Sequence, residues 1–294
     1  MKRITLNTSS SGLEYLHNVP HRVETIPLHL LINNVDFIDG QNINPDSFRK
    51  IISVAPNTIA KTSPATEEEV TRIFENLVKR GYQEVFVCTL SAKFSKSYDI
   101  LQKVKQNFSH IMDIYIYDTR TLNLGESALA YEADCLMQEG WAMDDIAHHL
   151  DDLRSRHLFI FTLSDLSYII RNKKLSTTSG FFANLFNIKP IMHINHDGYI
   201  TPYKKVRGFE QTLHKMVELV GETVGNNETY FYVADGGVKD LQEMFIRVLD
   251  EGFGLKNPPL IPISTISLAN HGPQGIGMGA FYGKLPRIIQ HLQQ

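Results

Sequence analysis

Two neighbouring hydroxyl side chains are the first residues of this sequence that could bind a ligand. Thr62 and Ser63 precede a segment of helical character in the stretch KTSPATEEEV. Thr66 and Glu69 already have the spacing of a capping box, which satisfies the first backbone N–H groups of a helix. The earlier pair is therefore free to donate hydrogen bonds to an anion. A turn in which the pair bonds its own backbone is the alternative.

Two more hydroxyl-rich stretches occur in the first half of the chain. LSAKFSKSY (90–98) lies between a predicted strand and a predicted helix, where backbone N–H groups and the helix dipole favour a carboxylate or a phosphate. In LNTSSSGLEYL (6–16), Ser11 and Glu14 have the spacing of a second capping box.

A glycine-rich stretch, NHGPQGIGMGAFYG (270–283), is predicted to be a loop after the last strand. Its glycines would let the backbone approach a ligand closely, and His271 stands at its entrance. A dinucleotide-binding loop is disfavoured, because the chain leaves no room after it for the second half of a Rossmann domain.

Two other features have both an ordinary and a functional interpretation. His193 and His196 flank a turn next to Asp197 and could be metal ligands, but exposed turn histidines are the preferred interpretation, and no metal is expected. The apolar, aromatic segment 179–188 is expected to pack in the core or, alternatively, to form the wall of an apolar pocket.

The first half of the chain alternates strand and helix signals. Residues 84–90 and 113–119 are short β-branched or aromatic runs, and residues 96–108 and 126–140 have helical periodicity. This alternation predicts a parallel sheet flanked by helices.

The second half has a different pattern. Residues 189–208 contain two apolar runs around Asp197-Gly198, which predicts a type I′ hairpin. Residues 227–237, a helix over 238–252 and residues 257–272 complete an α/β unit with a mixed sheet. We therefore expect an α/β protein of two domains, 1–155 and 156–294, with the ligand site between them.

Composition and charge exclude some functional classes. The chain has 294 residues and a net charge of −3, which argues against nucleic-acid binding. We expect no membrane span and no secretory signal. Cys88 and Cys135 have no metal-like spacing and are expected to be buried free thiols in a reducing compartment, so we expect a cytoplasmic protein.

The order of these motifs resembles the DegV family, and the resemblance covers nearly the whole chain. It implies a two-domain α/β fold and a long-chain fatty acid bound in an internal tunnel, with no other cofactor. It also implies that the protein is the non-catalytic, fatty-acid-binding subunit of a bacterial fatty acid kinase. The stretches that carry the resemblance are 61–70, 90–98, 117–125, 186–208 and 271–277.

The resemblance also implies roles for single residues. Lys174 and Arg207 would contact the head group or a phosphate, and Arg207 could instead contact the kinase. The residues implied to bind the fatty-acid carboxylate are Thr62, Ser63, Ser91, Ala92, Asn270 and His271.

Several positions depart from the family pattern. The family's Thr-Asp-Ser is here Leu6-Asn7-Thr8, and its Gly-Gly-Arg is here Asn172-Lys173-Lys174. Lys174 supplies a positive charge without the planar fork of arginine. Asn270 holds the position of the family's histidine, and His271 follows one place later.

Two enzymatic alternatives compete with the binding protein. A hydrolase of a lipid ester would use Ser63 or Ser91 with His271 and Asp118, although the chain has no G-x-S-x-G elbow. A phosphoryl-transfer enzyme would need a phosphate-binding P-loop, which the sequence lacks. The expected function is therefore fatty-acid binding without catalysis.

Overall fold

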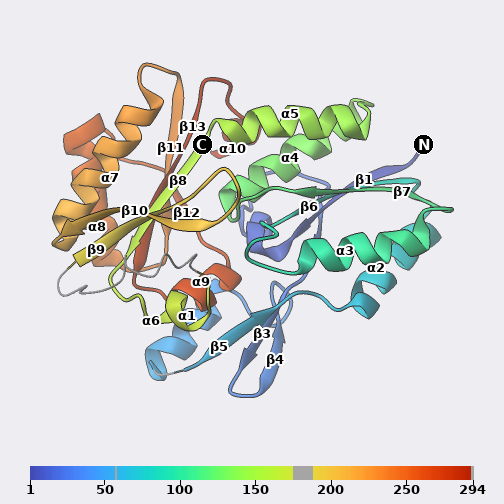
Figure 1. The fold of residues 1–294 in the computed structure, drawn as a ribbon, viewed down its shortest axis with the longest axis horizontal. Helices are drawn as coiled ribbons and strands as arrows, with labels where there is room; N and C mark the ends of the chain where they lie inside the picture. The colour runs from blue at the N-terminus through green and yellow to red at the C-terminus, as the bar shows by residue number, and fades with distance from the viewer. Residues whose placement is uncertain (57, 175–187, 293–294) are drawn as a thin grey trace.

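The molecule is built on three β-sheets (Figure 1). A computed structural model describes residues 1–56, 58–174 and 188–292, so the predicted apolar segment 179–188 lies outside the described residues except for its last position. The sheets have the strand orders β2-β1-β6-β7, β10-β9-β8-β13-β11-β12 and β4-β3-β5. The α/β class predicted from the sequence is confirmed.

The four-stranded sheet is parallel throughout, as predicted. One central strand holds a continuous apolar run, residues 85–88, because helices cover both faces of the sheet. The strands are β1 (Arg3–Thr8), β2 (Glu24–Ile26), β6 (Glu84–Thr89) and β7 (Asp113–Asp118).

Helices lie on both faces of this sheet (Figure 1). On one face are α2 (Glu67–Lys79) and α3 (Ser97–Lys105), the latter continued by a 3-10 turn, η3 (Gln106–Phe108); on the other are α4 (Leu124–Gln138) and α5 (Met143–Ser155). The capping box at the start of α2 is confirmed: the Thr66 side chain accepts from the Glu69 N–H, and the Glu69 carboxylate accepts from the Thr66 N–H.

The capping box predicted for Ser11 and Glu14 is wrong. The stretch forms two 3-10 turns, η1 (Ser9–Ser11) and η2 (Leu13–Tyr15), and the Ser11 hydroxyl accepts from the Leu13 N–H at 3.1 Å. Both carboxyl oxygens of Glu14 are buried without a hydrogen-bond partner among the described residues, and burial raises the pKa of this group to about 8. The left-handed backbone of Gly12 between the two turns prevents a regular helix here.

The six-stranded sheet is mixed, as predicted, because only β11 and β12 pair in parallel. Two helices, α7 (Phe209–Val224) and α8 (Lys239–Phe253), pack on one face. The strands are β8 (His157–Leu163), β9 (Ile188–Ile194), β10 (Ile200–Arg207), β11 (Thr229–Asp235), β12 (Leu260–Pro262) and β13 (Gly275–Tyr282). This sheet begins at His157, and the division of the chain after residue 155 stays a prediction.

The hairpin of β9 and β10 is confirmed, but the predicted turn type is wrong. A type I′ turn needs positive φ at both Asp197 and Gly198. Only Gly198 has it, at 84°, and the Gly198 N–H donates to the Asn195 carbonyl at 2.9 Å. The connection is therefore a longer loop that ends in a left-handed glycine.

The predicted glycine loop is also wrong, because most of it is strand β13, between β8 and β11. Helix α9 (Thr265–His271) precedes β13 and occupies the end of the segment 257–272, where a strand was predicted. The glycines of β13 make room for aromatic rings of the neighbouring strands. A Cβ atom at Gly279 would overlap the ring of Tyr232, and one at Gly277 would lie 3.0 Å from Cβ of Phe161.

We expect Gly279→Ala to lower the free energy of unfolding by about 2 kcal/mol, because the added methyl group overpacks the face of the sheet that holds Tyr232. Urea unfolding of the purified variant measures this. In a Tyr232→Leu background the same change should cost less, since the ring is gone. An equal cost in both backgrounds would contradict the packing explanation.

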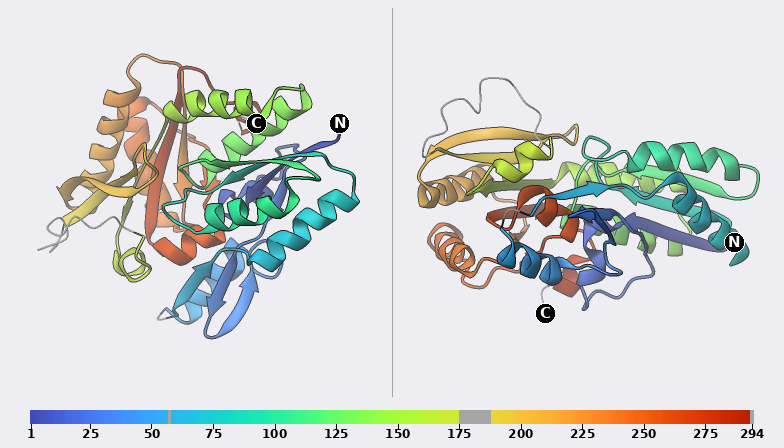
Figure 2. Two further views of the ribbon diagram at one scale, coloured as in Figure 1. Left: turned by 45° about the vertical axis from the view of Figure 1, so that its right-hand side comes forward. Right: turned by 90° about the horizontal axis from the view of Figure 1, so that it is seen from below.

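The three-stranded antiparallel sheet was not predicted. It comprises β3 (His29–Ile32), β4 (Val35–Ile38) and β5 (Ala60–Ser63), with α1 (Pro45–Val54) inserted before β5. Figure 2 shows it beside the junction of the two larger sheets. The short helices α6 (Ser167–Arg171) and α10 (Ile289–Leu292) complete the fold.

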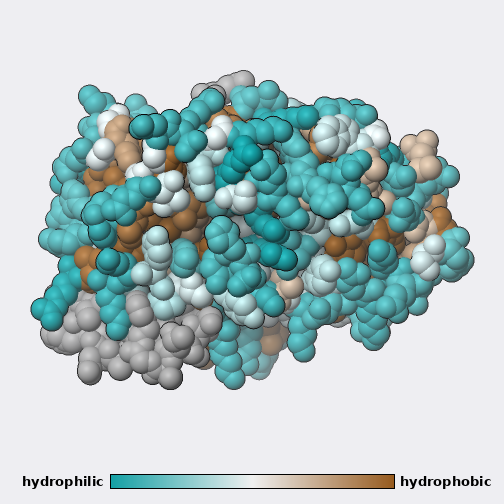
Figure 3. All heavy atoms as spheres, turned by 45° about the horizontal axis from the view of Figure 1, so that its top comes forward, coloured by the Kyte–Doolittle hydropathy of each residue, from teal (hydrophilic) through white to brown (hydrophobic). Residues whose placement is uncertain are grey.

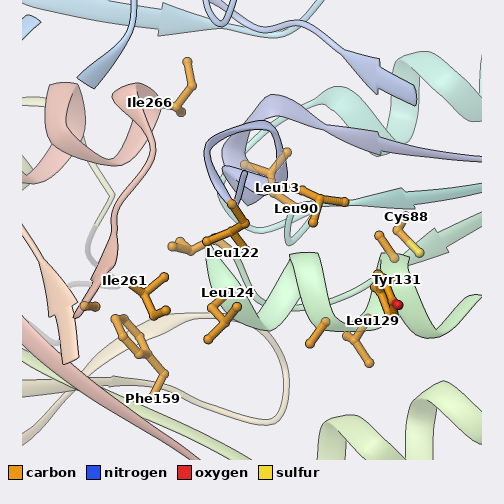
Figure 4. Packing of buried hydrophobic residues seen from close by; sticks show 14 of the residues in the cluster. Leu13, Cys88, Leu90, Leu122, Leu124, Leu129, Tyr131, Phe159, Ile261 and Ile266 are labelled. Carbon is orange, nitrogen blue, oxygen red and sulfur yellow. The ribbon is translucent and has the colours of Figure 1, made fainter. Parts of the chain in front are cut away.

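One buried cluster joins the two halves of the chain. Figure 4 shows Leu124 from the first half near Phe159 and Ile261 from the second. Most of the face in Figure 3 is hydrophilic, and hydrophobic residues show mainly in recesses. Among the described residues, no helix combines the length and the apolar character that crossing a membrane requires.

Both cysteines are free thiols, in line with the sequence. Cys88 is buried, but Cys135 is only partly buried, which corrects the prediction that both are buried.

Candidate functional site

A cavity of about 350 Å³ lies where the end of β5, the loop after β6, helix α9 and the start of β10 come together. Its lining combines polar and apolar side chains. The lining residues are Ser10, Leu28, Thr62, Ser63, Pro64, Leu90, Ala92, Lys93, Phe94, Ser95, Lys96, Leu122, Lys174, Ile200, Ile266, Ser267, Asn270 and His271. A volume of this size is within the range of small-molecule sites, about 300–1,000 Å³.

Strand β5 brings the predicted hydroxyl pair to the cavity. Thr62 pairs with Leu30 of β3, and Ser63 ends the strand opposite His29. The amide of Asn270 donates to the Thr62 hydroxyl at 3.2 Å. The Ser63 side chain is exposed and forms no hydrogen bond within the described part of the chain, so its hydroxyl is available to a ligand.

Asn270 is fixed by helix α9. Besides its contact with Thr62, its amide donates to the Ile266 carbonyl at 2.8 Å, one turn earlier in the helix. This bond orients the amide toward the end of β5. The structure thus brings together Thr62, Ser63 and Asn270, three of the residues that the resemblance implies for the carboxylate.

The loop after β6 is arranged differently from the prediction. Ser91 is fully buried, does not line the cavity, and its hydroxyl donates to the Gly198 carbonyl at 2.8 Å. Ala92 does line the cavity, but its N–H donates to a carboxylate oxygen of Asp118 at 3.1 Å. Both groups predicted for the carboxylate therefore already have partners within the protein.

Lys174 supplies a positive charge to the cavity. Its ammonium group donates to the Phe94 carbonyl at 2.6 Å, and burial lowers its pKa. An anionic ligand stabilises the charged form of an ammonium group that is held away from water, because the ligand's charge compensates for the lost hydration.

His271 lines the cavity beside Lys174. Its ring lies 5.4 Å from that of Phe161, and burial together with the charge of Lys174 lowers its pKa to about 4. The imidazole is therefore neutral at pH 7 and can act as a hydrogen-bond donor without charge.

The lowered pKa of His271 makes stability depend on pH in a defined window. The unfolded imidazole takes up a proton below about pH 6.5, whereas the folded one does so only near pH 4. The unfolded chain holds more protons between these values, so the unfolding temperature of the ligand-free protein should fall from pH 6.5 to pH 4. His271→Gln should show a shallower fall. Equal slopes in thermal melts would show that His271 does not contribute.

The cavity also has apolar lining. The larger apolar side chains come from five separate parts of the chain, and Figure 4 shows Leu90 near Leu122, with Ile266 apart from them on α9. These side chains are Leu28, Leu90, Phe94, Leu122, Ile200 and Ile266. An elongated ligand with one charged end and an apolar body matches this combination of polar and apolar groups.

The structure adds hydroxyls that the sequence did not single out. Ser10, at the turn after β1, donates to the buried Glu126 carboxyl at 2.7 Å, and Ser267 donates to Asn123 at 2.9 Å. Burial raises the pKa of Glu126 to about 8. Ser10 belongs to the hydroxyl-rich stretch 6–16, but the sequence does not show that this residue lines the same cavity as the loop after β6.

Arg207 does not line the cavity. It is exposed near the end of β10, seven residues beyond Ile200, which places it roughly 23 Å along the strand at about 3.3 Å per residue. A direct contact with a ligand head group in the cavity does not follow from this position.

The geometry does not favour the hydrolase. Within the described part of the chain, His271 has no hydrogen bond to a serine, and the Asp118 carboxylate accepts from the N–H groups of Ala92 and Arg120. The same part of the chain contains no cluster of three or more His, Cys, Asp or Glu side chains that could hold a metal ion.

Comparison with known proteins relates both fold and sequence to one family. The model of the DegV family, described as uncharacterised proteins, matches residues 8–283. A DegV domain-containing protein of Clostridium acetobutylicum is 24% identical over 282 residues, which cover 96% of this chain and 99% of the relative.

Solved structures show the same fold. A fatty-acid-binding DegV family protein from Streptococcus agalactiae superposes with a TM-score of 0.84 at 22% identity, over 97% of this chain and 100% of that one. A stearic-acid-binding protein from Eubacterium ventriosum has a TM-score of 0.82 at 20% identity, over 96% and 98% of the two chains.

Proposed function

The chain belongs to the DegV family, and from this premise we propose that it binds one long-chain fatty acid and acts as a binding protein rather than an enzyme. The observation that carries the proposal is the mixed lining of the cavity, which combines hydroxyls and cations with aliphatic side chains. The related proteins described as binding fatty acids support the same ligand class.

In this proposal the carboxylate lies at the polar side. Thr62 and Ser63 donate hydroxyl hydrogen bonds, and Lys174 supplies the compensating charge. His271 donates from α9, and the Asn270 amide holds the Thr62 hydroxyl in place. A buried carboxylate requires several such partners, and each hydrogen bond to a charged group contributes about 1.5–3 kcal/mol.

The acyl chain lies against the aliphatic side. Burial of each methylene contributes about 0.8 kcal/mol, so a long chain binds tightly without any reactive group in the protein.

The free thiol of buried Cys88 suits a reducing compartment and supports the predicted cytoplasmic location.

The decisive experiment is mass spectrometry of a solvent extract of the purified protein. We expect one long-chain fatty acid in nearly equimolar amount, and recovery of binding when fatty acid is added back to delipidated protein. An empty extract with no binding on addition would refute the proposal. Turnover of a lipid ester that is lost in Ser63→Ala would instead establish the hydrolase.

We further propose that the bound fatty acid is presented to a separate fatty acid kinase. Strand β10 is an edge strand with Lys204 and Arg207 exposed, which suits contact with a protein partner. Arg207→Ala should leave fatty-acid affinity unchanged and lower phosphorylation by the kinase about tenfold. Arg247→Ala, an equal loss of charge on exposed α8, is the control. Lost lipid binding, or unchanged kinase turnover, would refute this role.

A further inference from the structure

A second pocket, of about 140 Å³, shares no described lining residue with the first cavity. It is formed by the loop after β7, the end of α5, the start of β8 and the hairpin. The residues that line it are Arg120, Thr121, Arg154, Ser155, His157, Leu158, Phe159, His193, Ile194, Asn195, His196, Thr223 and Tyr282. None of these described lining residues is acidic, in a chain whose net charge is −3.

Arg120 is the principal charge of this pocket. It is exposed, and its guanidinium forms no ion pair or hydrogen bond with the part of the chain that the structure describes. Its backbone is left-handed, with φ at 52°, and its N–H donates to the Asp118 carboxylate at 2.9 Å. Such a conformation is unfavourable for arginine and is held here by the turn.

The hairpin holds the second side of the pocket against Arg120. A Cβ atom at Gly198 would lie 3.0 Å from Cβ of Arg120, so the glycine allows the hairpin tip to approach this closely. The tip carries the exposed His196, and His193 stacks on Tyr203 with ring centroids 4.5 Å apart. Burial and the neighbouring His196 both lower the pKa of His193.

Further donors face the same space. Thr121 is 4% exposed, and its buried hydroxyl has no hydrogen-bond partner among the described residues. Arg154 is held by Asp151 at 2.9 Å and donates to the Asp118 carbonyl at 3.4 Å, so it retains part of its donor capacity. A buried hydroxyl without a partner is costly unless a ligand or water satisfies it.

We propose that this pocket binds a phosphate-class oxyanion, either free orthophosphate or the phosphoryl group of a small phosphomonoester. Two guanidinium groups, two imidazoles and a hydroxyl provide hydrogen-bond donors in several directions. The oxygens of a tetrahedral oxyanion can accept from donors in all of these directions, whereas the two oxygens of a planar carboxylate can accept from fewer. The pocket is distinct from the fatty-acid cavity, and the proposal does not depend on the nature of the ligand there.

Isothermal titration in a phosphate-free buffer at constant ionic strength tests the proposal, with orthophosphate and glycerol phosphate as separate probes. We expect saturable binding at one site per chain. Arg120→Gln and His196→Gln should each weaken it about tenfold, the effect of losing one charge-assisted hydrogen bond. Both residues are exposed, so the variants should fold, and circular dichroism checks this.

Arg247→Gln removes the same charge from exposed α8 and should leave the affinity unchanged. Tighter binding of glycerol phosphate would identify a phosphomonoester, and tighter binding of orthophosphate would identify the free ion; both support the site. The absence of saturable binding, or an affinity in both pocket variants equal to that of the native protein, would overturn it. Binding lost only in Lys174→Gln would place the anion in the fatty-acid cavity and would also overturn it.

Discussion

Replacing Thr62 and Ser63 together with alanine is expected to weaken long-chain fatty-acid binding about a hundredfold. Each hydroxyl lines the cavity, and two hydrogen bonds to a carboxylate at about 1.5 kcal/mol each give roughly 3 kcal/mol. Thr62 is only half-buried and Ser63 is exposed, so the free energy of unfolding of the ligand-free protein should change by less than about 1 kcal/mol. Titration with a fluorescent fatty acid measures the first quantity and urea unfolding the second.

The matched control exchanges the two side chains, Thr62→Ser with Ser63→Thr, and retains both hydroxyls. It should bind within a few-fold of the native protein, because donor number is conserved while shape changes slightly. Asn270 keeps its bond to the Ile266 carbonyl in both variants, so α9 is not disturbed. If the double alanine variant binds as tightly as the native protein, the carboxylate does not lie at the end of β5.

The position of this hydroxyl pair could be predicted from the sequence because the helix after it is capped by other residues. The capping box of Thr66 and Glu69 is local, so four neighbouring residues determine it. Local rules of this kind also located β6, β7, α3 and α4, but not the strands β1 and β2 of the same sheet. They worked because strand and helix periods differ clearly over these segments.

Partners far apart in the chain could not be predicted in the same way. Ser91 looks available in the sequence, but it is 107 positions from the Gly198 carbonyl that it contacts. The glycines of β13 suggest a loop when considered alone. They form a strand because Tyr232 and Phe161, on neighbouring strands, fill the space that their missing side chains leave.

The same limit applies to the small sheet and to part of the cavity. Strands β3, β4 and β5 have four residues each, too short for a periodic signal, and they exist because they pair with one another. Ser10 and Ser267 enter the cavity from opposite ends of the chain. Only the packing of α9 against the first half brings them together.

Reversing the charge of Lys174 is expected to have the largest effect on binding. Lys174→Glu places a carboxylate in the half-buried cavity where the ligand's own carboxylate should lie. Near a protein surface, two unit charges about 4 Å apart interact by roughly 4 kcal/mol, so losing the attraction should weaken fatty-acid binding at least about a thousandfold. Competition against a fluorescent fatty acid measures the affinity of each variant.

Lys173→Glu is the matched control, because it makes the same charge change at the adjacent, exposed residue, which does not line the cavity. It should weaken binding only a few-fold, since water and salt screen an exposed charge.

A long-chain alcohol distinguishes an effect of charge from an effect of cavity shape. Its affinity should be nearly the same in the native protein and in Lys174→Glu, because it carries no carboxylate to repel. Equal losses for the acid and the alcohol would mean that the substitution deforms the cavity, and equal losses in the two lysine variants would mean that only the overall charge matters. If only Lys174→Glu weakens binding, and only of the fatty acid, the carboxylate lies beside Lys174. This lysine then supplies the positive charge that the family's arginine supplies.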